Sequence, residues 1–384
     1  MNADNVSRRS FIGGTLAWSA AGLAACAPAA SPAPAPAGVS SPGAAGAEPW
    51  KAEWDRLLEA ARKEGTLSLA APVGTGIQKG VAAFEQAFAG VNVEVQGFAS
   101  ASLLIPRVDT ERQAGVFSWD VAQITIQSLL TSLKPKGVFD SLRAAVIRPD
   151  VTGDQYWTGG FDASFVDKER QFAFLMSEEA GGQFWINLDL VKDDEIKTVQ
   201  DLLNPRWKGK MLIQDVRAGS FTTFHAIRTN AGDEVVRKIL IDQAPVFSRD
   251  PRQITDGLVR GQYAIVRGVN DSYLQELRDK GVGRNVKAVD LPEARIVNSS
   301  GGLWLFNRAP HPNAAKLFIN WILTKEGQAA WCGANVWNSR RTDVPPSDPN
   351  TVPKPGGKYL YVVREETLQA QEDTRKWLES IVAQ

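Results

Sequence analysis

The amino-acid sequence predicts an α/β fold organised in two lobes, each with a mostly parallel sheet flanked by helices. Segments with the pattern of buried strands alternate with segments of helical spacing along most of the chain, and this alternation is typical of parallel sheets. The chain has 384 residues, which exceeds the roughly 100–150 residues of a common domain and favours two. With 43% hydrophobic and 22% charged residues, it has the composition of a globular protein.

The first 48 residues have the features of an export and attachment signal. Arg8 and Arg9 precede an apolar stretch from 11 to 25, and they resemble a twin-arginine signal. Cys26 follows Leu-Ala-Ala, which resembles the acylation site of a bacterial lipoprotein, so residues 1–26 predict an export signal with a lipidation site. Residues 27–48 are rich in Pro, Ala and Gly and predict a disordered tether. This tract disfavours the alternative, an N-terminal helix packed on the fold.

The elements of the first part follow from the spacing of apolar residues. Apolar side chains recur at helical spacing from Trp54 to Ala61, and Gly65 ends that predicted helix. Segments 66–71, 91–95 and 119–124 have the pattern of strands. The turns after the first two strands open helices that contain 81–88 and 103–112. Strands with helices between them predict one α/β lobe.

The middle of the chain repeats this order, and the end becomes helical. Polar turns at 215–220 and 270–273 begin two helices of a predicted second lobe. Strand patterns cover 171–176, 184–186, 211–213, 264–266 and 303–306, and helical patterns cover 199–203, 314–323, 325–331 and, after a Pro-rich loop at 345–357, 367–382.

Several segments resemble one family of binding proteins. Residues 309–318, Ala-Pro-His-Pro-Asn-Ala-Ala-Lys-Leu-Phe, and 324–328, Thr-Lys-Glu-Gly-Gln, resemble segments of periplasmic solute-binding proteins of the ferric-iron-binding and related group. Segments 187–191, 201–210, 215–220 and 261–265 match the same proteins in the same order, and the resemblance covers about residues 50–340. It implies the type II periplasmic-binding-protein fold, a ligand between the lobes, and the permease of an ABC importer as partner.

The resemblance also implies where the chain crosses between the lobes, near Ser177–Gly182 and near Leu291–Ser299. We therefore expect a first lobe from residues 49–178 and 292–384, and a second lobe from residues 182–290. The polar, glycine-rich segment 178–182 suits a bending point.

The candidate binding site consists of the polar turns that follow predicted strands. Ligands of open α/β sheets bind beyond the carboxyl ends of strands, where helix N-termini present free N–H groups to anions. Arg217 can bind an anion through two hydrogen bonds, although a salt bridge is an equal alternative, and the hydroxyl groups can also serve as helix caps. The predicted ligand-binding residues are Gly74, Thr75, Gly76, Ser100, Ser102, Asp215, Arg217, Ser220, Thr222, Asn270, Asp271 and Tyr273.

The resemblance raises ferric iron as a ligand, but the residues favour a small organic anion. Iron-binding members carry two adjacent tyrosines after the strand that resembles 261–265, and this chain has Ser272 and Tyr273 there. A neutral serine is a poor ligand for a ferric ion. We therefore expect a carboxylate, phosphonate or phosphate ester and no cofactor, and we keep ferric iron as the alternative.

Composition disfavours several other functions. The 43 basic and 43 acidic residues balance, which gives no support for nucleic-acid binding. Two histidines and two cysteines nearly exclude a zinc site, and no G-x-S-x-G or H-E-x-x-H motif supports a hydrolase. We expect His311 to be a helix-entry residue and Cys332 a buried free thiol. We expect a monomeric, lipid-anchored binding protein of the periplasm or cell surface, with an exported enzyme or a ligand sensor as alternatives.

Overall fold

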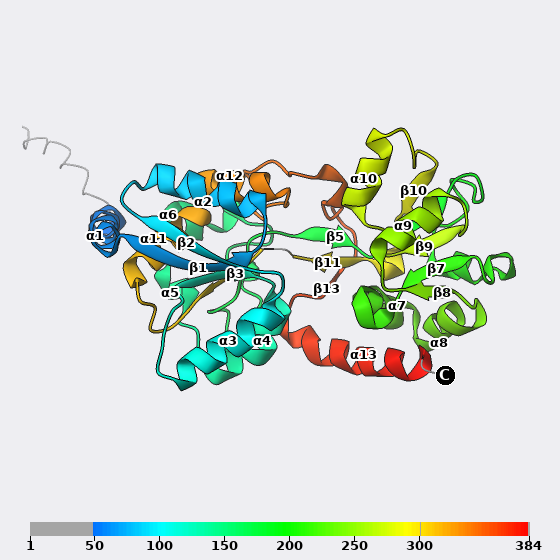
Figure 1. Ribbon diagram of the computed structural model, residues 1–384, viewed down its shortest axis with the longest axis horizontal. Coiled ribbons are helices and arrows are strands. Elements are labelled where there is room, and N and C mark those ends of the chain that lie inside the picture. The colour runs from blue at the N-terminus through cyan, green and yellow to red at the C-terminus, as the bar shows by residue number, and fades with distance from the viewer. Residues whose placement is uncertain (1–48, 300, 383–384) are drawn as a thin grey trace, which may run out of the picture. The chain divides into compact units, whose positions relative to one another are not determined.

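The computed structural model describes residues 49–299 and 301–382 (Figure 1). The predicted export signal, the lipidation residue Cys26 and the tether at 27–48 lie outside the described residues. Among the helices of the described ranges, none has the length and apolar character needed to cross a membrane. The body begins with α1 (Pro49–Glu64), which ends at Gly65 as predicted, because the positive φ of 71° there favours glycine.

The first lobe is built on a five-stranded sheet, in which β1 runs parallel to β2 and β3 while β12 runs antiparallel to β3 and β4. The parallel strands come from successive strand–helix units. The strand order is β2 (Asn92–Phe98), β1 (Thr66–Pro72), β3 (Val121–Ile124), β12 (Gly302–Leu305) and β4 (Phe174–Leu175). Its helices are α2 (Thr75–Ala87), α3 (Ala101–Gln113), α4 (Ile126–Ser132), α5 (Leu142–Ala145), α6 (Pro149–Thr152), α11 (Pro312–Ile322) and α12 (Lys325–Asn335).

The second lobe is built on another five-stranded sheet, in which β7 runs parallel to β8 and β9 while β6 runs antiparallel to β9 and β10. The strand order is β10 (Val286–Val289), β6 (Phe184–Asn187), β9 (Ile265–Arg267), β7 (Met211–Gln214) and β8 (Val246–Ser248). Its helices are α7 (Phe221–Ala231), α8 (Asp233–Arg237), α9 (Pro251–Val259) and α10 (Asp271–Asp279). The α/β class is confirmed, but the expected mostly parallel sheets are mixed, because the strands that adjoin the crossings between lobes run antiparallel to their neighbours.

The two predicted crossing segments pair with each other. β5 (Glu179–Gly181) and β11 (Ile296–Asn298) run antiparallel, and β13 (Leu360–Tyr361) joins β11 in parallel to make a third, small sheet between the two larger ones (Figure 1). Gly182 follows β5 with a φ of 91°, and an added Cβ would lie 1.9 Å from the carbonyl oxygen of Ala294. Only glycine therefore fits where the chain leaves this sheet for the second lobe.

A buried ion pair lies at the start of this crossing. Glu178 and Arg340 have only 6% and 2% of their surface exposed, and the Arg340 guanidinium binds the Glu178 carboxylate. Burial raises the pKa of Glu178 and lowers that of Arg340, while each charge opposes the shift of the other. Both side chains remain buried because they pair.

The last helix connects the two cores. α13 (Leu368–Val382) begins with Leu368 against the core of the first lobe and ends with Leu378 and Ile381 in the core of the second. Just before it, Glu365 forms a 2.6 Å ion pair with Lys134 of the first lobe. The end of the range expected for the first lobe, 292–384, therefore packs in the second core.

Candidate functional site

The turns predicted to bind ligand lie at the carboxyl ends of parallel strands. In the first lobe, Pro72 of β1 pairs in register with Phe98 of β2, so the turns at 74–76 and 100–102 follow at the same edge of the sheet. In the second lobe, Gln214 pairs with Ser248, and Ile213 pairs with Arg267. The turns at 215–220 and 268–271 therefore also share one edge, which is the arrangement expected of a ligand site in an α/β sheet.

The first-lobe turns present hydroxyl groups and a close backbone contact. The hydroxyl groups of Ser100 and Ser102 lie 2.6 Å apart and are exposed, as is Thr75. Ser100 and Gly74 are the N-cap residues of α3 and α2, but neither offers a side-chain cap. At Gly76 an added Cβ would lie 2.5 Å from Oδ1 of Asn335, so this glycine lets α2 approach the end of α12.

Asp215 and Arg217 are engaged with each other. Asp215 accepts hydrogen bonds from Arg217 Nε (2.8 Å) and Nη2 (2.7 Å) and from Arg249 Nε (3.0 Å), and it also caps the backbone N–H of Arg217. The hydrogen bond from the Arg217 side chain holds the pKa of Asp215 far below its usual range. The salt bridge that was the alternative role for Arg217 is therefore observed, and both of its partners belong to the second lobe.

Ser220 and Thr222 lie where α7 begins. Ser220 is fully buried, and its hydroxyl oxygen has no hydrogen-bond partner among the described residues, whereas Thr222 is half-buried. A buried hydroxyl group without a partner costs free energy. A polar group held at this turn would satisfy it.

Asn270 caps α10, and Tyr273 is turned toward α9. The Asn270 side chain accepts the backbone N–H of Tyr273 at 2.9 Å. The Tyr273 hydroxyl donates to Asp256 Oδ1 at 3.0 Å, and this bond raises the pKa of the phenol. A phenol that coordinates a ferric ion loses its proton, so iron binding at Tyr273 would have to break this hydrogen bond.

The sequence analysis missed Arg267, the last residue of β9. Its Nε donates to Thr223 Oγ1 at 2.9 Å, the one hydrogen bond of this guanidinium within the described ranges. Burial lowers the pKa of Arg267 to about 10, against the opposing effect of Asp271. Arg267 is half-buried, and a guanidinium that is partly shielded from water and has free donors can bind an anion through charge-assisted hydrogen bonds. The signal in the sequence was an arginine that closes the apolar strand at 264–266 directly before Gly268.

Two glycines bring Arg267 close to the predicted turn at 215–220. An added Cβ on Gly219 would lie 2.6 Å from Gln214 Oε1, and one on Gly268 would lie 2.5 Å from Gln214 Cβ. The φ of 107° at Gly268 independently requires glycine. The turns after β7 and β9 therefore pack on one side chain, and Ser220, Thr223 and Arg267 belong to the same small region.

A loop from the far side of the hinge approaches Asp271. Nearby protein raises the pKa of Asp271 by partial desolvation, although the residue is exposed at the surface; Arg267 opposes this shift and Asp348 adds to it. Asp348 is held by Asn338, which accepts its backbone N–H at 2.9 Å, and Asn335, the last residue of α12, adjoins Gly76. The end of α12 and the loop after it thus connect the two groups of turns.

This arrangement of turns on two sheets agrees with the comparison to known families. The model of the bacterial extracellular solute-binding protein family matches residues 79–350. The chain is a bacterial extracellular solute-binding protein. No curated protein sequence matches it.

Solved structures of similar fold are two-lobe binding proteins with different ligands. Iron-bound HitA from Pseudomonas aeruginosa is 15% identical, with a TM-score of 0.59 over 82% of this chain and 99% of HitA. FutA of Trichodesmium, in complex with iron and citrate, is 19% identical, with a TM-score of 0.63 over 83% and 99%. AfuA from Actinobacillus pleuropneumoniae, with fructose-6-phosphate bound, is 18% identical, with a TM-score of 0.56 over 82% and 97%. At these identities the similarity shows the fold alone, which is the two-lobe fold implied by the resemblance.

The remaining singled-out residues of this solute-binding protein have structural roles. His311 is the N-cap residue of α11, and its ring and backbone N–H bind the buried Asp120 at 2.8 and 2.7 Å. His225 is buried, with Nδ1 2.9 Å from Thr374 Oγ1 of α13. Cys332 is a buried free thiol whose pKa is raised by burial. Within the described ranges, no group of three acidic, histidine or cysteine side chains could hold a metal ion.

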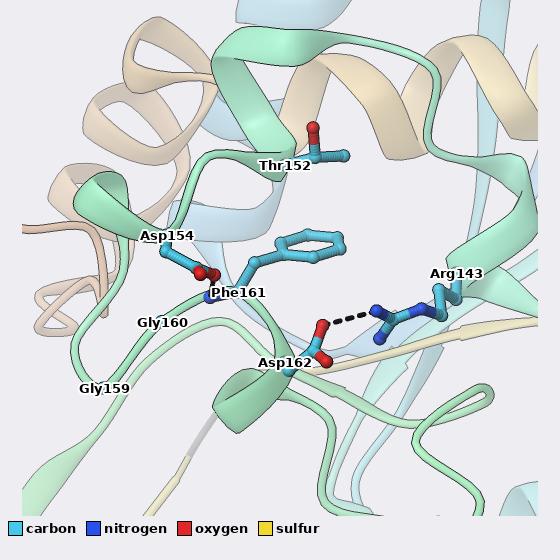
Figure 2. A pocket seen from close by; sticks show the side chains of 7 residues that line it. All are labelled: Arg143, Thr152, Asp154, Gly159, Gly160, Phe161 and Asp162. Atoms are coloured by element: carbon cyan, nitrogen blue, oxygen red, sulfur yellow. Dashed lines mark hydrogen bonds and ion pairs between the residues drawn. The ribbon is translucent and has the colours of Figure 1, made fainter.

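Two hollows lie away from the turns. One, of about 720 Å³, is lined by first-lobe residues 143–162, and in it Arg143 pairs with Asp162 while Asp154 accepts the N–H of Phe161 (Figure 2). The other, of about 380 Å³, includes Arg206, Trp207 and Lys210 of the second lobe. Neither is lined by a predicted ligand-binding residue.

Proposed function

We propose that this solute-binding protein captures a small organic anion between the carboxyl edges of its two sheets and delivers it to the permease of an ABC importer. The observation that carries the proposal is Arg267, a cation at a strand end with one internal hydrogen bond. Family membership supports binding rather than catalysis.

The residues around Arg267 suit an anion. Ser220 offers a buried hydroxyl group without a partner, and the N-terminus of α7 contributes the positive end of a helix dipole. Thr223 already orients the guanidinium. Arg217 is a weaker candidate because Asp215 occupies two of its donors.

Ferric iron is the alternative, and it takes second place here. The Tyr273 hydroxyl donates a hydrogen bond to Asp256, and Ser272 precedes it in the sequence. An iron site would have to break that hydrogen bond and recruit further anionic oxygens.

The family and the N-terminal segment support a proposal for the location and the partner of this protein. We propose that Cys26 is acylated after export and that the tether holds the protein at a membrane surface near its permease. Cys26→Ala should release the protein from the membrane fraction without changing ligand binding. An unchanged membrane fraction would contradict lipid attachment.

Native mass spectrometry tests the ligand class most directly. The purified full chain should carry an organic anion, and its mass should vanish after unfolding and refolding. A bound mass that matches iron alone would overturn the proposal. Small-angle scattering tests the mechanism, because a ligand that touches both lobes only in the closed form shifts the population toward closure. An unchanged radius at saturation would contradict closure.

A further inference from the structure

The two groups of turns differ in charge. The first-lobe turns 72–76, 98–103 and 124–127 contain no ionisable side chain. The second-lobe turns contain Asp215, Arg217, Arg249, Asp250, Arg267 and Asp271. A ligand held between these edges therefore meets no ionisable side chain on the first-lobe turns, and the carboxylate of Asp348, from the loop after α12, acts on Asp271 of the second lobe.

The uncharged side also exposes apolar side chains. Val73 and Leu103, from the turns after β1 and β2, have 73% and 56% of their surface exposed. Val336, which caps α12 next to Asn335 and so lies near Gly76, has 63% exposed. Single exposed apolar residues are ordinary on protein surfaces. Here three of them come from two turns at the carboxyl edge of one sheet and from the helix end beside Gly76, where a ligand held at this edge can cover them.

The polar groups of this edge are neutral hydroxyls. Ser100 and Ser102 already bond each other at 2.6 Å, so each has less capacity for a ligand. Thr75 is exposed. Such an edge can accept hydroxyl or alkyl groups, but a second carboxylate would lose its hydration with no cation to replace it.

We propose that the ligand is amphiphilic, with one anionic group bound by Arg267 in the second lobe and an uncharged, largely apolar body held against Val73, Leu103 and Val336 of the first. This inference rests on the proposed function and names its substrate class. The anionic group is a carboxylate or a phosphate, which a guanidinium binds in the same way.

A homologous series of ligands tests whether the anionic group and the apolar body bind to different lobes. Titration calorimetry would compare butanoate, hexanoate and octanoate with hexanedioate, and butyl phosphate with hexyl phosphate. Affinity should rise about two- to fourfold for each methylene buried, and hexanedioate should bind at least about tenfold more weakly than hexanoate. Stronger binding of the alkyl phosphates than of the carboxylates would identify the anionic group as a phosphate. It would not change which lobe binds the anionic group and which binds the apolar body.

Variants locate the effect on the first lobe. Val73→Ser combined with Leu103→Ser should flatten the gain per methylene, while butanoate still binds through Arg267. Val116→Ser is the matched control, because Val116 is 48% exposed but precedes β3 at the opposite edge of the same sheet. An undiminished gain in the double variant would overturn the inference, since the apolar body would then lie elsewhere.

The outcomes separate this inference from the proposed function. Two results count against the amphiphilic ligand: hexanedioate binds as tightly as hexanoate, or only a polar ester such as a sugar phosphate binds. If Arg267→Gln abolishes that binding, the amphiphilic ligand is ruled out and the proposed function stands. If no anion binds, both fail.

Discussion

Arg217 and Arg267 carry the same guanidinium group but are engaged differently. Arg217 and Arg249 both form ion pairs with Asp215 at the start of a turn. Arg267 instead donates one hydrogen bond to a neutral threonine. An arginine with a fixed carboxylate partner has little to gain from a second anion. An arginine without one gains a full charge-assisted pair.

Substitution of each arginine by glutamine should separate these roles. Arg267→Gln should weaken anion binding about tenfold to a hundredfold, because a lost hydrogen bond to a charged group costs about 1.5–3 kcal/mol. Arg217→Gln is the matched control and should change affinity less than about threefold. Titration calorimetry gives both values, and a larger effect at Arg217 would move the anion site to the turn after β7.

The raised pKa of Asp271 predicts a pH dependence with a definite sign. Above that pKa the Asp271 carboxylate competes with an incoming anion for the field of Arg267; below it the carboxyl is neutral. Affinity for an alkanesulfonate, which stays ionised, should therefore increase as the pH falls from neutrality. It should decrease above about pH 10, where Arg267 loses its proton.

Asp271→Asn should remove the acidic part of this profile and leave the alkaline part. Calorimetric titrations at several pH values measure both. A flat profile in the wild-type protein between neutral and acidic pH would show that Asp271 does not sense the bound anion.

Residue-level reasoning identified the polar turns but did not single out Arg267, for a physical reason. Polar residues after a strand indicate a helix N-cap or a ligand-binding site. Asp215 and Asn270 are helix N-caps, as expected. Arg267 belongs to a strand of three residues whose two predecessors are buried. A pattern of apolar residues shows where a strand lies, but not which neighbour leaves a donor free at its end.

At the scale of elements, α13 is the clearest departure from the sequence analysis. The terminal helix was predicted at 367–382 and is observed at Leu368–Val382, but its partner was not predictable. An apolar stripe specifies that a helix must pack, and not on which core. The strands β8, β10 and β13 were missed because none of them is a continuous buried apolar run: each contains exposed or half-buried residues, unlike the predicted β3 and β12.

Leu378→Ala should destabilise the second lobe. Leu378 is fully buried in that core, and truncation of a buried leucine costs about 2–5 kcal/mol. Lys376→Ala on the exposed face of α13 is the control and should cost about 0.5 kcal/mol or less. Faster hydrogen exchange in α7 and β7 would show that the loss of stability lies in the second lobe. An equal change in both lobes would contradict the expectation that Leu378 stabilises the second lobe alone.

The ion pair at the crossing predicts an asymmetric response to mutation. Arg340→Met leaves Glu178 buried without a partner and should cost about 3–5 kcal/mol in denaturant unfolding. Adding Glu178→Gln should recover part of this loss, since no unpaired charge remains. If the double variant is no more stable than the single one, the loss reflects packing of Arg340 and not charge.

For the whole molecule, alternation and length were sufficient to predict two α/β lobes, and the crossings near 177–182 and 291–299 contain the observed β5 and β11. The direction of β6 and β12 was not evident, because a buried strand has the same apolar pattern whichever way its neighbours run. The placement of Arg267 beside Thr223 was also not evident, since it depends on which strands adjoin β9. These facts emerge only when distant segments meet.

The attachment of α13 at both ends has a consequence for the amplitude of any hinge motion. Glu365 and Leu368 hold its start to one lobe, and Thr374, Leu378 and Ile381 hold its end to the other. A large rotation of one lobe relative to the other must bend the few residues between these contacts or break the contacts at one end. The helix therefore limits the amplitude of the hinge rotation. Spin labels on α2 and α10 should report a broader distance distribution in a chain that ends at residue 367, and an equally narrow one would show that the hinge strands alone set the limit.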